Sequence, residues 1–519
     1  MHYKKSIYKQ VLLIITIVSA ILINCSVSIA TPIGQGGYEE GDNIIKDIYR
    51  ETTPVSKKDK ILYEAQHLLN SGEYDDAINK VNEALKKSPA SVTAYEILGA
   101  SLVNKGEIDK GLDAFKKANK LDPKSGSINT KIAAVYMSKG QNKSAKSHLK
   151  EAISINPNDR KAHQLLGIIY EKEEENATAI EHYEKGLAGM PQEYIGIKVN
   201  LARLYNISNR FDKALSLLEN LITRDNKNTT AHIVLGTTYL GLEKTDKAIE
   251  EFVIAAKLEP GTERTHLALG KAYRGKGDYK KSINEMDEVI KIAPKWPAGY
   301  FQKGETLFIM KQYNEALKNY KKAVNLSDED IQINKRIADI YLVQKKFPEA
   351  IIIYEEIIKS KKSTFEDKFI LATLYQDARS NNKAIKLYRD IIAEKPDHVL
   401  ALNNLAALLS ETGVQDEAVK LAQKAASLGS GNGYVLDTYG WILFKQNKFH
   451  EALMVLKKSA LLIQDNPSIL YHIGMAYYKN NQKEEALKQF EKAIKLSNNF
   501  QEYKEYLKMR NELTGAKKK

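Results

Sequence analysis

The stretch of this chain closest to a nucleotide-binding motif is Gly270–Gly277, GKAYRGKG. A phosphate-binding loop needs a Ser or Thr after its lysine to contact magnesium, and a strand before its first glycine. Here Gly277 stands where the hydroxyl residue belongs, and the preceding residues are not typical of a strand. We therefore predict no nucleotide site in this stretch.

Histidine, cysteine and acidic residues also give no metal or catalytic pattern. The ten histidines are scattered; His163, His232 and His266 share one position of the repeat described below, where a bulky packing residue is expected. No set of cysteines or carboxylates completes a zinc site around them. Cys25 is the single cysteine, which excludes disulfides within the chain. The sequence predicts no catalytic residues, no metal and no cofactor, and hence a protein that is not an enzyme.

The charge of the chain is basic but evenly mixed. The net charge is +13 and the isoelectric point about 9.1, yet lysine and glutamate alternate along most segments. Such mixing is typical of solvated helix surfaces, and the clearest run of like charge is Lys517–Lys519. We predict no nucleic-acid partner.

Residues 1–30 read as an export signal. Lys4, Lys5 and Lys9 precede the apolar run Val11–Ile23, and Ser28–Ala30 fits a small-x-small cleavage site. Three fates stay open: cleavage after Ala30, lipidation of Cys25 or retention as an anchor. Lipidation is disfavoured by Asn24, and the apolar run is short for a membrane span. We expect an exported protein, periplasmic or envelope-associated, that meets a membrane only through this segment.

Residues 31–57 have no sustained period and are expected to form a linker, with a short helix at Asn43–Arg50. From residue 58 a unit of 34 residues recurs thirteen times, with one spacing of 35, up to residue 498. Repeat position 8 is always Gly or Ala, as at Gly440. Position 20 is Ala in eleven units, as at Ala452. Each unit reads as two amphipathic helices whose small residues permit close contact. Residues 499–519 are expected to form a capping helix, Phe500–Leu513, and a basic tail.

This pattern resembles the tetratricopeptide repeat family, whose units have this length and the same small, Tyr, Ala and Pro positions. The resemblance implies an all-α solenoid, a right-handed superhelix of about thirteen helix-turn-helix repeats. It also implies that the first helices line a concave groove, and it places positions 2, 5, 6, 9, 12 and 13 of each repeat at that surface. Terminal repeats of such arrays need polar caps.

Two zones of this surface differ from the repeated pattern. Repeats five to seven carry the cations Arg203, Arg264, Lys271 and Arg274, which suit a carboxylate-bearing peptide or an acidic polymer. The alternative is ordinary solvated charge. Repeats twelve and thirteen carry exposed aromatics that suit a peptide or a sugar ring, or that pack between repeats; they are Tyr434, Trp441, Phe444, Tyr471 and Tyr478. Asn403, Asn404 and Asp437 offer polar groups nearby.

The segment from Leu400 to Ala493 is also similar to exosortase-associated (PEP-CTERM system) tetratricopeptide proteins. The matching stretches are LALNNLAALLSETG, VLDTYGWILFKQNKFHEAL and ILYHIGMAYYKNNQKEEALKQF. That resemblance implies a role in surface-protein sorting or in exopolysaccharide and biofilm assembly. We therefore expect a binding scaffold of the bacterial cell envelope that holds a partner protein or peptide. The alternative is a glycan-binding protein that carries a polysaccharide.

Overall fold

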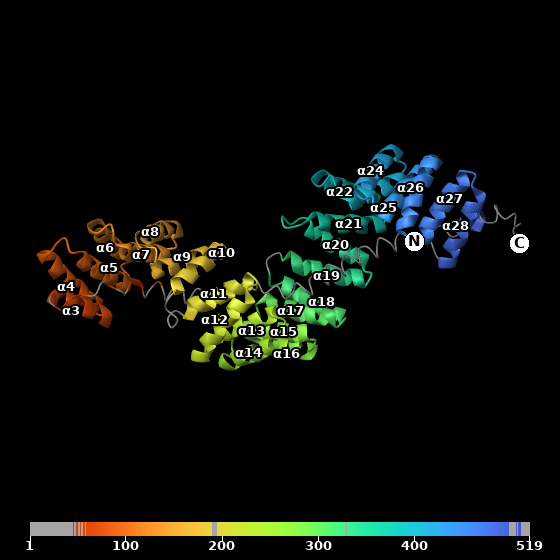
Figure 1. Ribbon diagram of the computed structural model, residues 1–519. Helices are drawn as coiled ribbons and strands as arrows, with labels where there is room; N and C mark the ends of the chain where they lie inside the picture. The colour runs from red at the N-terminus through yellow and green to blue at the C-terminus, as the bar shows by residue number, and fades with distance from the viewer. Residues whose placement is uncertain are drawn as a thin grey trace. The chain divides into compact units, whose positions relative to one another are not determined.

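The structure is a computed structural model that describes residues 45, 48, 49, 52, 55–57, 59–188, 195–327, 330–497, 505 and 507–509. Over these residues the chain forms thirteen successive helix pairs, α3–α28, and no strand (Figure 1). The expected all-α stack of helix pairs is confirmed. Contacts divide the chain between Ile292 and Ala293 into two compact units. We call α3–α16 the N-terminal array and α17–α28 the C-terminal array, and describe each by itself.

The helices of the N-terminal array are α3 Lys60–Ser71, α4 Tyr74–Lys87, α5 Val92–Lys105, α6 Ile108–Leu121, α7 Gly126–Ser138, α8 Asn142–Ile155, α9 Arg160–Lys172, α10 Asn176–Leu187, α11 Ile195–Ile207, α12 Phe211–Arg224, α13 Thr229–Gly241, α14 Thr245–Leu258, α15 Glu263–Lys276 and α16 Tyr279–Ile292. The helices of the C-terminal array are α17 Pro297–Ile309, α18 Tyr313–Val324, α19 Ile331–Val343, α20 Phe347–Ile357, α21 Phe365–Asp377, α22 Asn381–Glu394, α23 Val399–Glu411, α24 Gln415–Leu428, α25 Gly433–Lys445, α26 Phe449–Leu462, α27 Pro467–Lys479 and α28 Lys483–Leu496.

The first helix of each repeat begins at the residue that the 34-residue period predicts, except that α3 begins at Lys60 instead of residue 58. Short polar side chains fix several of these starts. Ser91, Ser125 and Asp159 each accept a hydrogen bond from the backbone N–H three residues ahead. Such caps satisfy amides that have no partner within the helix.

The turn between the two helices of a repeat has the same backbone conformation in all thirteen units. Repeat position 15 has a positive φ throughout, at Gly72, Gly106, Gly140, Glu174, Asn209, Glu243, Gly277, Lys311, Lys345, Arg379, Gly413, Asn447 and Asn481. Only glycine enters this left-handed region without steric cost. The closely packed helix pair therefore imposes the conformation even where the sequence provides Lys, Glu or Arg.

Within a pair, the small residue at position 8 lies against a large residue at position 24. A Cβ added to Gly440 would lie 2.7 Å from Cγ of Leu456, and one added to Gly99 would lie 2.8 Å from the ring of Phe115. Ala452, at position 20, is fully buried. These contacts confirm the predicted close approach of the two helices.

Residues at both ends of the repeats belong to the cores of the arrays. In the stretch expected to be a linker, Ile45, Ile48 and Tyr49 are helical and each is 4% exposed. After the last repeat, Leu507 and Met509 are helical and pack against a cluster that includes Phe490. The remainder of the expected capping helix and basic tail lies outside the described residues.

The part of the chain that the structure describes contains no helix both long and apolar enough to span a bilayer. The export signal expected at residues 1–30, with Cys25, lies outside that part.

Candidate binding groove

The first helices of several neighbouring repeats contact one another, as α3 does α5, α11 does α13 and α25 does α27. Successive second helices of the described arrays make no comparable contacts. Elements on the inside of a curved stack lie closer together than those on the outside. The first helices therefore line the concave side, and we call positions 2, 5, 6, 9, 12 and 13 of each repeat the inner face.

Several buried or half-buried charges on the inner face are paired across neighbouring repeats. In the N-terminal array, Lys131 Nζ lies 2.6 Å from Glu96 Oε1, and both side chains are buried. Arg203 is paired with Glu171, which also accepts a hydrogen bond from Tyr183 Oη at 2.7 Å. Arg203, which the sequence grouped with the cations of α15, is thus bound to α9.

The C-terminal array contains similar pairs. Arg336 lies 2.9 Å from Glu305 and 3.5 Å from Asp339, and Lys335 lies 2.8 Å from Asp367. Burial raises the pKa of Asp339 to about 6, although Arg336 acts in the opposite direction. The inner-face charges in these repeats therefore hold the stack together and are not available as a set to a ligand.

Lys271 of α15 differs from these. Arg264, Lys271 and Arg274 lie at i, i+7 and i+10, which places them on one helix face. The structure gives Lys271 no hydrogen bond and no ion pair within the described residues, and its side chain is half-buried. Arg264 has only Glu263 nearby, at 3.9 Å, and Arg274 is 9% exposed.

The environment of Lys271 disfavours its own charge. Desolvation and, secondarily, the neighbouring Arg274 lower the pKa of its ammonium group. A carboxylate placed beside Lys271 and Arg274 would offset both effects, because an opposite charge favours the ionised lysine. We call Arg264, Lys271 and Arg274 the basic zone; chemically it suits a ligand carboxylate.

The aromatic residues of repeats twelve and thirteen are largely engaged with one another. Trp441 stacks with Phe444 at a centroid distance of 4.7 Å and with His472 at 4.1 Å. Tyr434 is 40% exposed, whereas Trp441, Phe444 and Tyr478 are half-buried. The stacking surface that a sugar ring would use on Trp441 is in part taken up by its own neighbours.

The expectation that Tyr471 is exposed was wrong. Its side chain is 1% exposed, and its hydroxyl donates to Glu505 Oε2 at 3.2 Å. Residues beyond the last repeat cover it because the terminal helix pair has no following repeat to bury its apolar side. The position in the repeat could not reveal this cover.

The polar groups expected beside the aromatics are also engaged. Asp437 pairs with Nδ1 of His472 at 2.8 Å, and both side chains are buried. Asn403 donates to Asn404 at 3.2 Å, and Asn404 donates to the hydroxyl of Tyr388 at 3.3 Å. We call the inner face of α25 and α27 the aromatic zone; it is satisfied internally.

The three histidines at repeat position 4 each bond a side chain from the second helix of their own repeat. His232 and His266 bond Glu251 and Glu285 at 2.6 and 2.8 Å. His163 lies 2.8 Å, between Nδ1 atoms, from His182, whose pKa falls to about 4 through desolvation and then through His163. No group of three His, Cys, Asp or Glu residues suited to a metal occurs in the described part of the chain.

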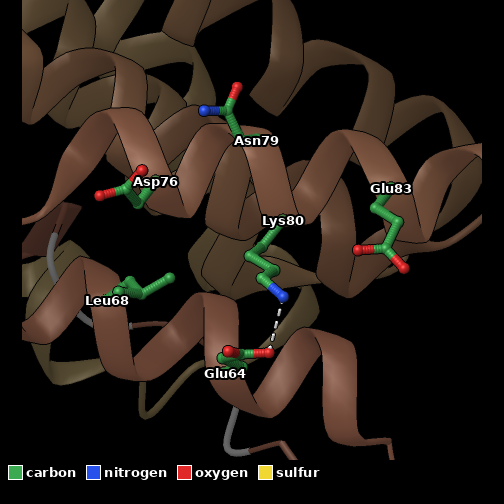
Figure 2. A pocket seen from close by; sticks show the side chains of 6 residues that line it. All are labelled: Glu64, Leu68, Asp76, Asn79, Lys80 and Glu83. Atoms are coloured by element: carbon green, nitrogen blue, oxygen red, sulfur yellow. Dashed lines mark ion pairs between the residues drawn. The ribbon is translucent and has the colours of Figure 1, made fainter.

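One surface pocket lies between α3 and α4, lined by Glu64, Leu68, Asp76, Asn79, Lys80 and Glu83 (Figure 2). Lys80 is paired with Glu64 at 2.9 Å. The other charged side chains that line the pocket are the carboxylates of Asp76 and Glu83. The arrangement has neither the buried polar groups nor the ligand geometry of a catalytic site.

The sequence predicts a short helix at Asn43–Arg50 but places it in a linker, so it missed the burial of Ile45, Ile48 and Tyr49 against the array. Their spacing of i, i+3, i+4 within a supposed linker was the available signal. It was weak because one helical turn of apolar residues is common by chance.

Comparison with known proteins gives repeat families along much of the chain. Residues 52–194 match the model of the cytochrome c-type biogenesis protein H TPR domain, and residues 411–493 match that of anaphase-promoting complex, cyclosome, subunit 3. Residues 263–295, 297–330 and 371–433 match tetratricopeptide repeat models. No curated protein matches the chain.

Several solved structures are similar to the chain. One is a tetratricopeptide repeat protein from Parabacteroides merdae, with 20% identity, 48% of this chain and 98% of that chain covered, and a TM-score of 0.42. Another is the APC/C hetero-tetramer Cut9–Hcn1, with 13% identity, coverage of 88% and 96%, and a TM-score of 0.36. A third is YrrB, a TPR protein with an unusual peptide-binding site, with 21% identity, coverage of 36% and 96%, and a TM-score of 0.34. Tetratricopeptide repeat models thus match several stretches of the chain, and the thirteen helix pairs have the arrangement of a tetratricopeptide repeat solenoid.

Proposed function

We propose that this protein is a non-enzymatic scaffold that holds an acidic segment of a partner protein in its groove, with the basic zone of α15 as the contact. The observation that carries the proposal is Lys271, a half-buried cation beside Arg274 with no ion-pair partner in the described residues. A charged lysine beside a second cation lowers the stability of the fold. Its presence is explained if a ligand carboxylate supplies the negative charge that the array does not. The other inner-face cations described above are paired within the array.

A binding experiment tests this directly. A fluorescein-labelled hexaglutamate peptide should bind the full chain, and Lys271→Met should weaken binding about ten-fold through loss of one charge-assisted contact. Lys280→Met is the matched control, because Lys280 is an exposed lysine on α16. Equal weakening by both variants, or no effect of Lys271→Met, would contradict the proposal.

We further propose that the scaffold works in the bacterial cell envelope, in surface-protein sorting or in exopolysaccharide and biofilm assembly. Support comes from the signal-like residues 1–30 and from the resemblance of Leu400–Ala493 to exosortase-associated proteins. Fractionation of cells that express the tagged chain, with N-terminal sequencing, tests the location. A mature chain that begins at Met1 in the cytoplasmic fraction would refute it.

A glycan-carrying groove is the alternative, and the exposed ring of Tyr434, on the same helix as Trp441, is the observation in its favour. Sugar binding on a glycan array that is lost in Tyr434→Ala would support it. The absence of any bound glycan would rule it out.

A further inference from the structure

A second part of the inner face is occupied by the chain itself. Ile45, Ile48 and Tyr49 belong to the core cluster that runs through the N-terminal array, although they precede the first repeat. Their spacing puts all three side chains on one side of a helical turn. The three apolar side chains are therefore buried against the array from one side of a helical turn.

Hydrogen bonds locate this segment on the inner face. The hydroxyl of Tyr49 donates to the carbonyl oxygen of Ala134 at 2.8 Å. The backbone N–H of Val55 donates to Oε1 of Gln66 at 3.1 Å, and the amide nitrogen of Gln66 donates to the hydroxyl of Thr52. Gln66 and Ala134 both stand at repeat position 9, so the segment crosses the inner face from α7 to α3.

The surface under the segment is shaped to receive it. Position 9 is Ala100 in α5 and Ala134 in α7, whereas later repeats of the N-terminal array carry Ile168, Arg203, Thr237 and Lys271 there. Two small residues in succession leave a trough, and both are fully buried. Ala407, at the same position in the C-terminal array, is only half-buried. The difference fits a cover over Ala100 and Ala134.

We propose that this trough of α3, α5 and α7 is a docking site for a short amphipathic helix of a partner protein, with two aliphatic residues and a tyrosine at i, i+3, i+4. Ile45, Ile48, Tyr49, Thr52 and Val55 of the chain itself contact this part of the array and would compete with the partner helix. The trough is a separate part of the inner face from the basic zone, so the inference does not rest on the acidic-peptide proposal.

The competitor is suited to being displaced. It contributes three large buried side chains, and docking fixes a stretch of backbone that the unfolded segment would leave free. The gain from such burial and the loss of conformational entropy are of similar size. Its advantage is its tether, which gives it an effective concentration on the order of millimolar. A partner helix with better contacts can therefore replace it.

The test uses a labelled peptide of residues 43–57, NIIKDIYRETTPVSK, and the full chain. The variant Ile45→Asp/Ile48→Asp expels its own segment, because two charges cannot stay buried without partners. We expect the peptide to bind this variant at least about ten-fold more tightly than the wild type, whose trough is occupied. Equal affinity for both proteins, or no binding to the variant at about 1 mM peptide, would overturn the proposal.

Variants of the trough complete the test. Adding Ala134→Arg to the expelled variant should abolish peptide binding, whereas adding Ala407→Arg, at the same repeat position in the C-terminal array, should not. If Ala134→Arg lowers the helical circular dichroism, the variant is misfolded, and Gln66→Ala in the expelled variant replaces it as the test of the trough. It removes the contacts to Thr52 and Val55 and should weaken the peptide several-fold. Full binding by Gln66→Ala would place the peptide elsewhere and refute the trough. Lys271→Met should leave peptide binding unchanged.

Discussion

The basic zone of α15 and the aromatic zone of α25 and α27 occupy equivalent surfaces of their arrays, yet their side chains are in opposite states. Lys271 has no ion-pair partner in the described residues, and its charge is disfavoured where it stands. Trp441, Asp437 and Tyr471 are satisfied by neighbouring side chains and by residues after the last repeat. The comparison teaches that an unusual residue on the inner face is a binding candidate only if the array itself does not use it.

The largest effect should come from Tyr471→Ala, which tests the internal role of the aromatic zone. A fully buried aromatic side chain is removed, so unfolding of the C-terminal array should become about 3–5 kcal/mol easier. Urea unfolding followed by Trp441 fluorescence measures this change. Tyr434→Ala is the control at an exposed aromatic of the same zone, and a similar loss in both variants would show that burial of Tyr471 is not the cause.

One histidine with a side-chain partner in each array extends the comparison to the effect of pH on stability. His472 has a carboxylate partner in Asp437, whereas His182 has His163. The pKa of His182 lies at about 4 in the folded chain, below its ordinary value of 6.5, so the unfolded chain takes up the proton first. The contribution of neutral His182 to the free energy of unfolding is therefore fully present above pH 6.5 and is lost as the pH falls toward 4. It amounts to about 1–2 kcal/mol after allowance for the partial exposure of His182.

Urea unfolding at pH 7.5 and pH 5 measures the pH effect. His182→Gln should reduce the difference between the two conditions, because it removes the group that titrates. An unchanged difference in this variant would assign the pH dependence to other groups.

A smaller effect of the opposite sign is expected at Lys271. Desolvation and Arg274 lower its pKa, so the charged form costs stability at neutral pH. Lys271→Met keeps the apolar stem and removes the charge, and it should stabilise the N-terminal array by about 1 kcal/mol. The same substitution at the exposed Lys280 should have little effect. Destabilisation by Lys271→Met would mean that the lysine is a structural residue and would break the comparison.

The smallest effects should come from the shared turn, which is alike in both arrays. Arg379→Gly removes the left-handed strain of a non-glycine residue and should stabilise by about 0.5–1 kcal/mol. Gly413→Ala, at the same repeat position of the next unit, should destabilise by a similar amount. Thermal unfolding measures both changes in stability. If both variants were stabilised, or both destabilised, the left-handed turn conformation would not be the cause.

The sequence was sufficient for the helix pairs because their contacts are local and repeated. The small residue at Gly440 and the large one at Leu456 lie 16 residues apart, and the same contact recurs in each repeat that has glycine at position 8. The left-handed turn at position 15 was only partly visible, since Gly413 signals it but Arg379 does not. The candidate sites were predicted by position alone, so Arg203 and Lys271 looked equivalent until Glu171 was seen beside one of them.

By itself, the sequence determined the period and the start of the first helix in nearly every repeat, because contacts between neighbouring segments of the chain decide both. The resemblance to a known repeat family supplied the residues that face the inside of the stack. Only the tertiary structure decided which inner-face groups are already engaged. Tyr471 is covered from beyond the last repeat, and Tyr49, from before the first, is buried and donates a hydrogen bond to Ala134. The physical reason is that a 34-residue period describes contacts between repeats, whereas these covers come from segments outside the period.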